Sequence, residues 1–416
     1  MNWISLALRN LHRNTRRSVT TIAAVALGYA AVNILAGFAT YMFASIRDGH
    51  IYEQSNGHVQ IWKKDARDYG GSDPAKYLIS GKEFTRIKTF AEADPRVSLA
   101  AGMLEVKGNM DYNGKPGFFV SQAMVPSEKR EIHSRSTALR SATGKDFTGD
   151  PITDETPFSI AITSGMAENM KIGPGSDVIL MTPSVNGQMN ALDARIAQII
   201  DVASEALNNR YIFMPLKLAQ ALYETDGVSC VRILLQKGAD SEADAVARSL
   251  RTKFPDSDWE VVTWNEISPL YNRTKRMFSI IFGLVFAIIA IIVTMSVLNT
   301  IGMAVVERTR EIGTLRAIGL KRPGVVKLFG IESACLGFIG AIGGLIITLA
   351  FAGAVSLIQP VWEPPVSART IVWEIRLIPQ FLLITFVFLT LFTTLAAIAP
   401  ARRAAQKGIV DALGHV

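Results

Sequence analysis

The sequence predicts an α-helical membrane protein with four transmembrane helices and a large α+β extracytoplasmic domain between the first and second helices. Hydrophobic residues make up 49% of the 416 residues, a high share for a soluble protein. A helix needs about 20 apolar residues to cross a hydrocarbon core of roughly 30 Å. Four stretches meet this need and are too long and too uniformly apolar for ordinary buried helices. They are residues 18–46, 277–306, 325–358 and 377–398.

The chain begins with a short segment, residues 1–17, in which apolar and basic side chains recur with a helical period. This pattern predicts an amphipathic helix at the membrane interface, although a basic tail that only orients the first span has the same charge. The apolar residues of this predicted helix are Trp3, Ile4, Ala7, Leu8 and Leu11. The span that follows is longer than the apolar core of a signal peptide, so we interpret it as a retained anchor.

Basic residues collect on one side of the predicted spans. They occur before the first span, in the loop 307–324 and in the tail 399–416, whereas the loop 359–376 has few of them. The positive-inside rule therefore places both termini and the loop 307–324 in the cytoplasm. Arg273 and two neighbouring basic residues oppose this orientation, but they follow a long domain, where the rule has little weight.

The segment 47–276 has the pattern of a folded α+β domain outside the cytoplasm. Its acidic and basic residues nearly balance, so it lacks the basic surface that nucleic-acid binding requires. A polar, proline-containing stretch near 125–157 predicts a linker between two lobes. The predicted strands are 58–62, 117–124, 158–162, 177–181, 196–202, 211–214, 231–235 and 259–263, and the predicted helices are 83–93, 165–170, 216–223 and 242–254.

The loop 307–324 carries the strongest functional signal in the chain. Charged and apolar residues alternate in it directly after a membrane-length apolar run, and its apolar residues recur at a spacing of three. This pattern predicts a short amphipathic helix, which is unstable alone and needs a groove on a cytoplasmic protein. The residues predicted to contact that protein are Glu307, Arg308, Arg310, Glu311, Ile312, Gly313, Leu315, Arg316, Ile318 and Gly319.

The third span is rich in glycine and contains a small-xxx-small pair at Gly340 and Gly344. Small residues let helix backbones approach closely, which promotes helix association in lipid. We therefore expect Gly337, Gly340 and Gly344 to pack against another helix, within the chain or across a dimer. The alternative is a permissive helix, because glycine is common in spans.

The sequence contains no motif for catalysis, cofactor binding or metal binding. The three Gly-Lys pairs lack the Ser or Thr of a nucleotide-binding loop, and the five histidines lack metal-ligand spacing. Cys230 lies in the inserted segment and Cys335 in a span, so we expect no disulfide between them. We therefore expect no catalytic residue, no cofactor and no metal in this chain.

The segments 307–319 and 327–344 (KLFGIESACLGFIGAIGG) closely resemble the signature of the FtsX-like permeases, the membrane subunits of mechanotransmission-type ABC transporters. This family includes MacB, FtsX and the lipoprotein-releasing proteins LolC and LolE. The order of elements agrees as well, including residues 261–266 (VVTWNE) and the closing segment 400–405 (PARRAA). We expect this chain to lack the fused ATPase domain of MacB, and its inserted segment is larger than that of bacterial FtsX.

The resemblance implies a role for the loop 307–324. It would be the coupling helix that sits in a groove of a separate cytoplasmic ABC ATPase, and ATP and magnesium would bind to that ATPase. Its charged residues would make the polar contacts, and its three apolar residues would insert into the groove. The family further implies a second permease copy or a related permease, in the inner membrane of a bacterium.

These expectations leave three functions open, and in each of them the chain is not itself an enzyme. The first, which we favour, is extraction or export of a lipoprotein or another hydrophobic cargo, with a periplasmic lipoprotein carrier as partner. The second is MacB-like export through a periplasmic adaptor and an outer-membrane channel. The third is FtsX-like signalling, in which the domain transmits ATP hydrolysis to a periplasmic hydrolase and moves no substrate.

Overall fold

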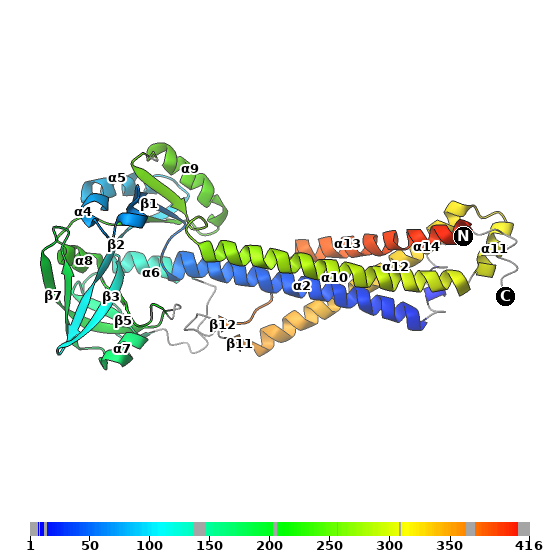
Figure 1. Ribbon diagram of the computed structural model, residues 1–416, viewed down its shortest axis with the longest axis horizontal. Helices are drawn as coiled ribbons and strands as arrows, with labels where there is room; N and C mark the ends of the chain where they lie inside the picture. Colours follow the sequence, from blue (N-terminus) through cyan, green and yellow to red (C-terminus); the bar gives the residue numbers. More distant parts are fainter. Residues whose placement is uncertain are drawn as a thin grey trace. The chain divides into compact units, whose positions relative to one another are not determined.

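The computed structural model describes residues 7, 9–11, 15–136, 147–202, 206–255, 257–307, 309–362 and 371–406 (Figure 1). The chain forms two compact units. The membrane unit comprises Met1–Met42, Thr274–Pro360 and Trp373–Val416, and the inserted domain comprises Phe43–Arg273 and Val361–Val372. Most of the predicted interfacial helix and the end of the tail lie outside the described residues.

Among the described residues, four helices of the chain are long and apolar enough to cross a membrane. They are α2 (Thr15–Asp48), α10 (Pro269–Glu307), α12 (Arg322–Ile358) and α13 (Pro379–Ala396). The predicted fold class, four such helices with an α+β domain after the first, is confirmed. At 1.5 Å per residue the 39 residues of α10 extend about 58 Å, well beyond the hydrocarbon core.

Two shorter helices among the described residues also belong to the membrane unit. α11 (Thr309–Ala317) follows α10, and α14 (Ile398–Gln406) continues from α13. α12 packs along both α13 and α14. A buried apolar cluster joins α10, α11, α12 and α14, and its members include Val305, Ile312, Val325, Phe329 and Ala401.

The inserted domain is built on one mixed sheet with the strand order β10-β1-β9-β2-β3-β8-β5-β7-β4, and β6 pairs with β2 and β7. The long strand β2 pairs with β9 along its first half and with β3 and β6 along its second half. The strands are β1 (Val59–Lys63), β2 (Val97–Tyr112), β3 (Lys115–Ala123), β4 (Phe147–Gly149), β5 (Ser159–Thr163), β6 (Asp177–Pro183), β7 (Met189–Ile200), β8 (Tyr211–Phe213), β9 (Cys230–Leu235) and β10 (Trp259–Thr263).

Helices cover both faces of this sheet. One face packs against α5 (Gly81–Glu92), α7 (Ser164–Met170), α8 (Leu216–Tyr223) and α9 (Ala243–Lys253). The other face packs against the π-helix η1 (Gly49–Glu53) and α6 (Pro126–Ser134). Strand β9 is buried along its whole length, because Val231 and Ile233 face the first cluster while Cys230 and Leu234 face the second. The remaining elements are α3 (Ala66–Tyr69), α4 (Pro74–Tyr77), the 3-10 helix η2 (Asp240–Glu242) and the hairpin of β11 (Val361–Trp362) and β12 (Ile371–Val372).

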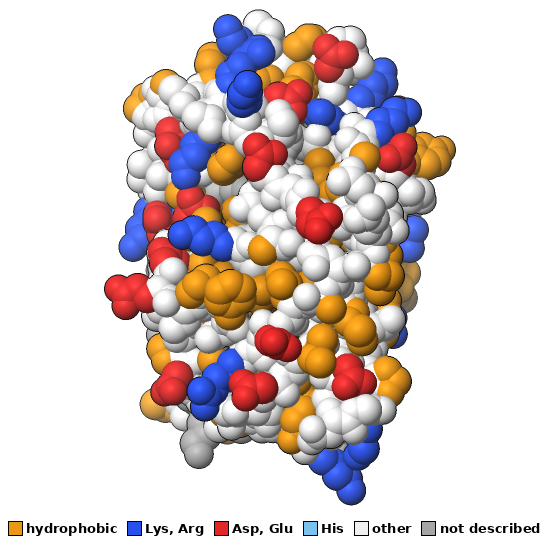
Figure 2. Space-filling view, turned by 90° about the vertical axis from the view of Figure 1, so that its left-hand side faces the viewer, with side chains coloured by type: hydrophobic (Ala, Val, Ile, Leu, Met, Phe, Trp, Pro, Cys, Tyr) orange, Lys and Arg blue, Asp and Glu red, His pale blue; other side chains and the backbone are white. Residues whose placement is uncertain are grey.

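The surface of the inserted domain mixes charge signs. Figure 2 looks onto one face of the molecule. Basic and acidic side chains are interspersed over this face, and hydrophobic side chains gather across the middle of it. Large apolar residues exposed in the inserted domain include Phe118, Ile179 and Met189. The visible face has no surface of a single charge sign, in agreement with the nearly neutral composition of residues 47–276.

The predicted strands and helices of the inserted domain each overlap an element of the structure. Strand β2 has no predicted counterpart. The stretch 125–157, predicted to link two lobes, contains α6, which packs against η1 and β2, and β4, which pairs with β7. The two halves of the sheet are joined instead by the continuous strand β2.

Candidate coupling site

The segment between the second and third spans contains a short helix, α11. α10 is described as far as Glu307 and α11 from Thr309, and α11 is followed by Gly319 with a φ of +105°. Glycine adopts this left-handed conformation without steric cost, so it suits a helix end. Pro323 then lies in the first turn of α12, where proline needs no hydrogen-bond partner for its nitrogen. Gly319 and Pro323 thus separate α11 from α12.

One side of α11 is held inside the membrane unit. Ile312 is 6% exposed and belongs to the same apolar cluster as Val325 and Ala401. Thr309 is buried as well, and its hydroxyl donates to the carbonyl of Val305 at 2.8 Å. α11 also contacts α14. The short helix therefore has a packing partner in its own chain.

The other side of α11 faces outward. Ile318 is 80% exposed, and Arg310 and Glu311 lie at exposed positions. Arg308 and the side chain of Leu315 lie outside the described residues.

This arrangement corrects one expectation from the sequence. Residues 312, 315 and 318 do not form one outward stripe, because Ile312 points into the chain. A spacing of six residues turns a helix by about 120° from a full turn, so Ile312 and Ile318 lie on different sides. Ile318 also lies just after the last residue of α11. Of the two apolar residues whose side chains are described, Ile318 is therefore the one available to a partner.

The start of the first span is joined to the end of the second. Arg17 Nη1 donates to Glu307 Oε1 at 2.6 Å, and both side chains are partly exposed. Glu307 was expected to contact a partner protein, and the structure gives it this contact within the chain.

The glycines of the third span lie where helices approach closely. A Cβ atom added at Gly340 would lie 2.7 Å from Cβ of Val25, and one added at Gly344 would lie 2.6 Å from Cβ of Tyr29. Gly337 faces α13 instead, where an added Cβ would lie 3.1 Å from Cα of Thr390. The structure therefore places Gly340 and Gly344 against α2, within one chain.

Polar side chains also join the spans, and the sequence analysis did not single them out. The hydroxyls of Thr21 and Thr300 lie 2.5 Å apart, and Asn33 Nδ2 donates to Thr385 Oγ1 at 3.0 Å. The Tyr29 hydroxyl donates to the carbonyl of Leu382 at 2.9 Å. A polar residue inside an apolar span usually faces another helix. The positions of these polar residues within the apolar spans could therefore have indicated the contacts between helices.

Within the described residues, no group of three His, Cys, Asp or Glu side chains could hold a metal ion. Cys230 and Cys335 are free thiols.

Comparison with known proteins decides the family. The MacB-like periplasmic core domain matches residues 18–252, and the FtsX-like permease C-terminal domain matches residues 281–409. The chain belongs to the MacB/LolC/FtsX family of ABC transporter permeases. The inserted domain of this permease therefore corresponds to a periplasmic core domain, and the long apolar helices make it an inner-membrane protein.

Two relatives match the permease over nearly its whole length. An uncharacterized ABC transporter permease of Methanocaldococcus jannaschii is 23% identical over 99% of this chain and 97% of its own. The lipoprotein-releasing system transmembrane protein LolC of Neisseria meningitidis is 24% identical over 99% of this chain and 98% of its own. The macrolide export ATP-binding/permease protein MacB of Escherichia coli is 30% identical, but over 45% of this chain and 28% of its own. Among solved structures, the periplasmic region of MacB from Actinobacillus actinomycetemcomitans aligns with 52% of this chain and 92% of its own, at 8% identity and a TM-score of 0.36.

Proposed function

We propose that this permease couples ATP hydrolysis in a separate cytoplasmic ATPase to movement of its inserted domain, and thereby extracts or exports a lipoprotein or another hydrophobic cargo. ATP and magnesium would bind to the ATPase and not to this chain. The observation that carries the proposal is that α11 is packed on one side and exposed on the other. Its inner side is held by its own chain, while Ile318, Arg310 and Glu311 are exposed for a partner.

The arrangement of the basic clusters supports a cytoplasmic position for α11 and for both termini. The ion pair of Arg17 with Glu307 and the contact of α11 with α14 bring three basic segments to one end of the membrane unit. Arg402 and Arg403 lie at exposed positions of α14. Clustered Arg and Lys beside the spans favour the cytoplasmic side.

The cargo is proposed from the relative that covers both chains almost completely. LolC is named for lipoprotein release, and it aligns along nearly the whole permease. The partial match with MacB supports a second candidate, export through a periplasmic adaptor and an outer-membrane channel. In either case we expect two permeases, identical or related, with two ATPase subunits.

A charge introduced at the exposed end of α11 tests the coupling. The permease carrying Ile318→Asp would be co-expressed with its ATPase subunit, solubilised and purified through a tag on the permease. Because the Ile318 side chain is 80% exposed, we expect normal membrane insertion and at least tenfold less co-purified ATPase. Ile358→Asp is the matched control, since Ile358 is 74% exposed at the other end of α12. Equal ATPase recovery from both variants would reject the assignment of α11.

A second experiment separates the cargo candidates. The permease–ATPase complex would be reconstituted in proteoliposomes that contain a fluorescent triacylated lipoprotein. ATP-dependent release of this lipoprotein to a soluble lipoprotein carrier would support the first candidate. Binding of a periplasmic adaptor without such release would support the second.

A further inference from the structure

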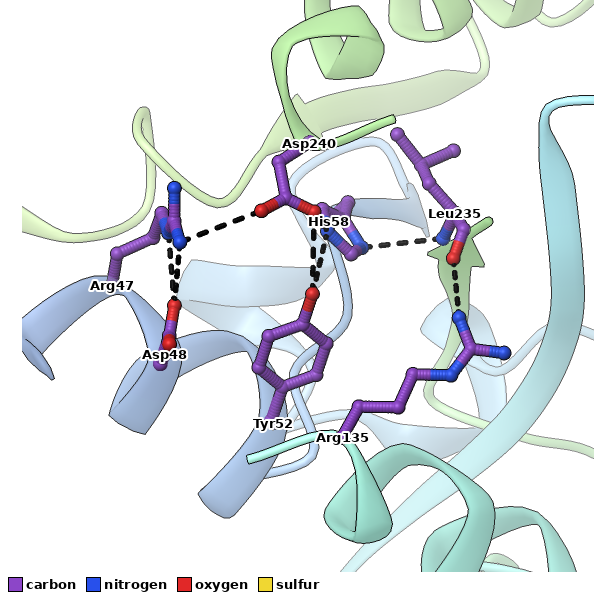
Figure 3. A network of polar contacts seen from close by, with 7 residues as sticks. All are labelled: Arg47, Asp48, Tyr52, His58, Arg135, Leu235 and Asp240. Carbon is purple, nitrogen blue, oxygen red and sulfur yellow. Dashed lines mark hydrogen bonds and ion pairs between the residues drawn. The ribbon is translucent and has the colours of Figure 1, made fainter. Parts of the chain in front are cut away.

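The C-terminal end of α2 and the helix η1 carry polar groups that other parts of the inserted domain bind. Figure 3 shows the side chains of Arg47, Tyr52 and His58 converging on Asp240, the first residue of η2. Asp240 Oδ1 accepts a hydrogen bond from the Tyr52 hydroxyl at 3.2 Å and lies 3.1 Å from His58 Nε2. Asp240 Oδ2 lies 3.4 Å from Arg47 Nη2, which also pairs with Asp48 at 2.8 Å. One carboxylate thus binds the last turn of α2, the helix η1 and the residue that precedes β1.

His58 connects this carboxylate to the sheet. The backbone N–H of Leu235 donates to His58 Nδ1 at 3.2 Å, so the hydrogen of the neutral ring lies on Nε2 and points to Asp240. The carbonyl of Leu235 accepts a hydrogen bond from Arg135 Nη1 at 2.6 Å, just after α6 (Figure 3). His58 itself is fully buried. The polar contacts therefore run without interruption from α2 to β9 and to the end of α6.

A second set of contacts holds the turn that follows η1. Arg232 of β9 is 2% exposed and lies on the sheet face that η1 covers. Its Nη1 donates to the carbonyl of Ser55 at 3.1 Å, and its Nη2 donates to Gln122 Oε1 at 3.0 Å. A buried charge is costly unless it is hydrogen-bonded, so these bonds hold the backbone after η1 in one position.

We propose that Asp240 is a positioning residue of the transport cycle. Together with Arg232 it clamps the end of the first spanning helix to the sheet, so that movement of the helix moves the inserted domain as one body. This inference rests on the proposed function, because it assigns the residues that pass the movement on.

The π-helix η1, which lies between the span and the sheet, is the reason that such a clamp is needed. A π-turn has one more residue per hydrogen-bonded ring than an α-helix, and such turns are frequent points of bending. Arg47 precedes η1, Tyr52 lies inside it and His58 follows it, and all three bind Asp240. Side chains that tie both sides of a turn to one carboxylate oppose bending at that turn.

A purely structural role would have a different consequence. If the cluster only stabilised the domain, its loss would lower the thermal stability and leave the movement per ATP unchanged. If it clamps the helix, its loss would leave ATP hydrolysis intact and reduce the movement. The two roles are separated by measuring hydrolysis and movement on the same sample.

The test uses the full permease with its ATPase in lipid nanodiscs. Spin labels are attached at Lys115, in the inserted domain, and at Ile358, in the membrane unit, after both native cysteines are replaced. The distance distribution between the labels is measured without nucleotide and with ADP and vanadate, and the ATPase rate is measured in parallel. We expect Asp240→Ala to retain the ATPase rate within twofold and to lose at least half of the nucleotide-dependent distance shift. Asp244→Ala, which removes an exposed carboxylate four residues later, should behave as the wild type.

Two further variants keep the test decisive if Asp240→Ala folds poorly. Tyr52→Phe removes one hydroxyl from the cluster and retains the packing of the ring, so it should give a smaller loss of the shift in the same direction. Asp240→Asn keeps the two hydrogen-bond acceptor contacts and loses the ion pair with Arg47, so it should restore most of the shift relative to Asp240→Ala. An unchanged shift in both Asp240→Ala and Tyr52→Phe would overturn the clamp and leave the proposed function standing. A wild-type complex that hydrolyses ATP without any shift would overturn both.

Discussion

Arg17 Nη1 lies 2.6 Å from Glu307 Oε1 and so joins the beginning of the first spanning helix to the end of the second. The side chains are 39% and 41% exposed, so the pair lies on the surface of the membrane unit. Exposed ion pairs usually contribute about 0–1 kcal/mol. The pair therefore contributes mainly to geometry, since it holds the start of α2 beside Glu307, the last described residue of α10.

We expect the pair to add little stability. In a double-mutant cycle of Arg17→Ala and Glu307→Ala, the interaction energy should stay below about 1 kcal/mol and decrease as salt is added. The measurement is urea unfolding of the full permease in detergent. An interaction energy of several kcal/mol that is insensitive to salt would show that the pair is buried in the assembled protein.

The glycines of the third span give a prediction with an internal control. Gly340→Ala and Gly344→Ala should each lower the free energy of unfolding by about 1–3 kcal/mol, because the new methyl group overlaps Val25 or Tyr29 of α2. Gly353 lies in the same helix with no atom within 4 Å of an added Cβ. Gly353→Ala should therefore be neutral or stabilising, since alanine favours the helix by about 1 kcal/mol over glycine. Equal effects at all three positions would show that helix propensity decides, and that close packing does not.

The sequence predicted elements whose pattern is visible locally, and it missed those whose pattern is set by the fold. Strand β2 had no counterpart because Ala100, Ala101, Met103 and Leu104 are all buried and face both sides of the sheet. A strand covered on both faces loses the alternation of polar and apolar residues by which strands are recognised. The spans were predicted because a long run of apolar residues identifies a span without any knowledge of the helices that pack against it.

The same distinction holds for the functional residues. The position of α11 followed from its charge and its place between two spans, but the inward side of Ile312 depended on α14, which comes later in the chain. The cluster around Asp240 brings together residues separated by 182 positions, and no local pattern indicates such a contact. Arg232 did carry a signal, because it is a charged residue inside the apolar run Cys230–Leu235.

Lys129 predicts a pH dependence of stability in the inserted domain. Burial, together with the nearby charge of Arg232, lowers the pKa of Lys129 to about 7. The unfolded chain, in which the pKa of lysine is about 10.4, therefore binds more protons between pH 7 and pH 10. Stability should rise with pH across this window and should be lowest below pH 7.

The expected gain between pH 6.5 and pH 8.5 is at most about 2 kcal/mol. It is an upper value, because Lys129 Nζ lies 3.7 Å from the ring centroid of Phe213, and that contact favours the charged form. Measurements should stay below pH 9, since burial raises the pKa of Cys230 to about 11 and its titration opposes the trend. Urea unfolding of Lys129→Met should lack the gain, whereas Lys82→Met, at an exposed position of α5, should retain it. A pH profile that Lys129→Met leaves unaltered would contradict the prediction.

Arg251 and Glu266 protect the open side of strand β10. Within the described residues β10 is the first strand of the sheet, and its pairing partner is β1. Arg251 Nε and Nη2 donate to the carbonyl of Val261 at 3.0 and 2.8 Å, and Glu266 Oε2 accepts the backbone N–H of Thr263 at 2.8 Å. The two side chains also pair with each other at 2.9 Å. Side chains that occupy the backbone groups of an edge strand prevent another strand from adding there.

Arg251→Ala should therefore have two effects, a loss of about 1–2 kcal/mol of stability and an increased tendency to self-associate. Arg248→Ala is the control, because Arg248 is an exposed arginine one turn earlier in α9. Urea unfolding measures the first effect, and sedimentation velocity of the detergent-solubilised permease at increasing protein concentration measures the second. Both substitutions remove one positive charge and so change the net charge equally. If only Arg251→Ala self-associates, the cause is therefore the opened edge of β10 and not the change in charge. Equal self-association of the two variants would instead attribute the effect to charge and leave the edge without a protective role.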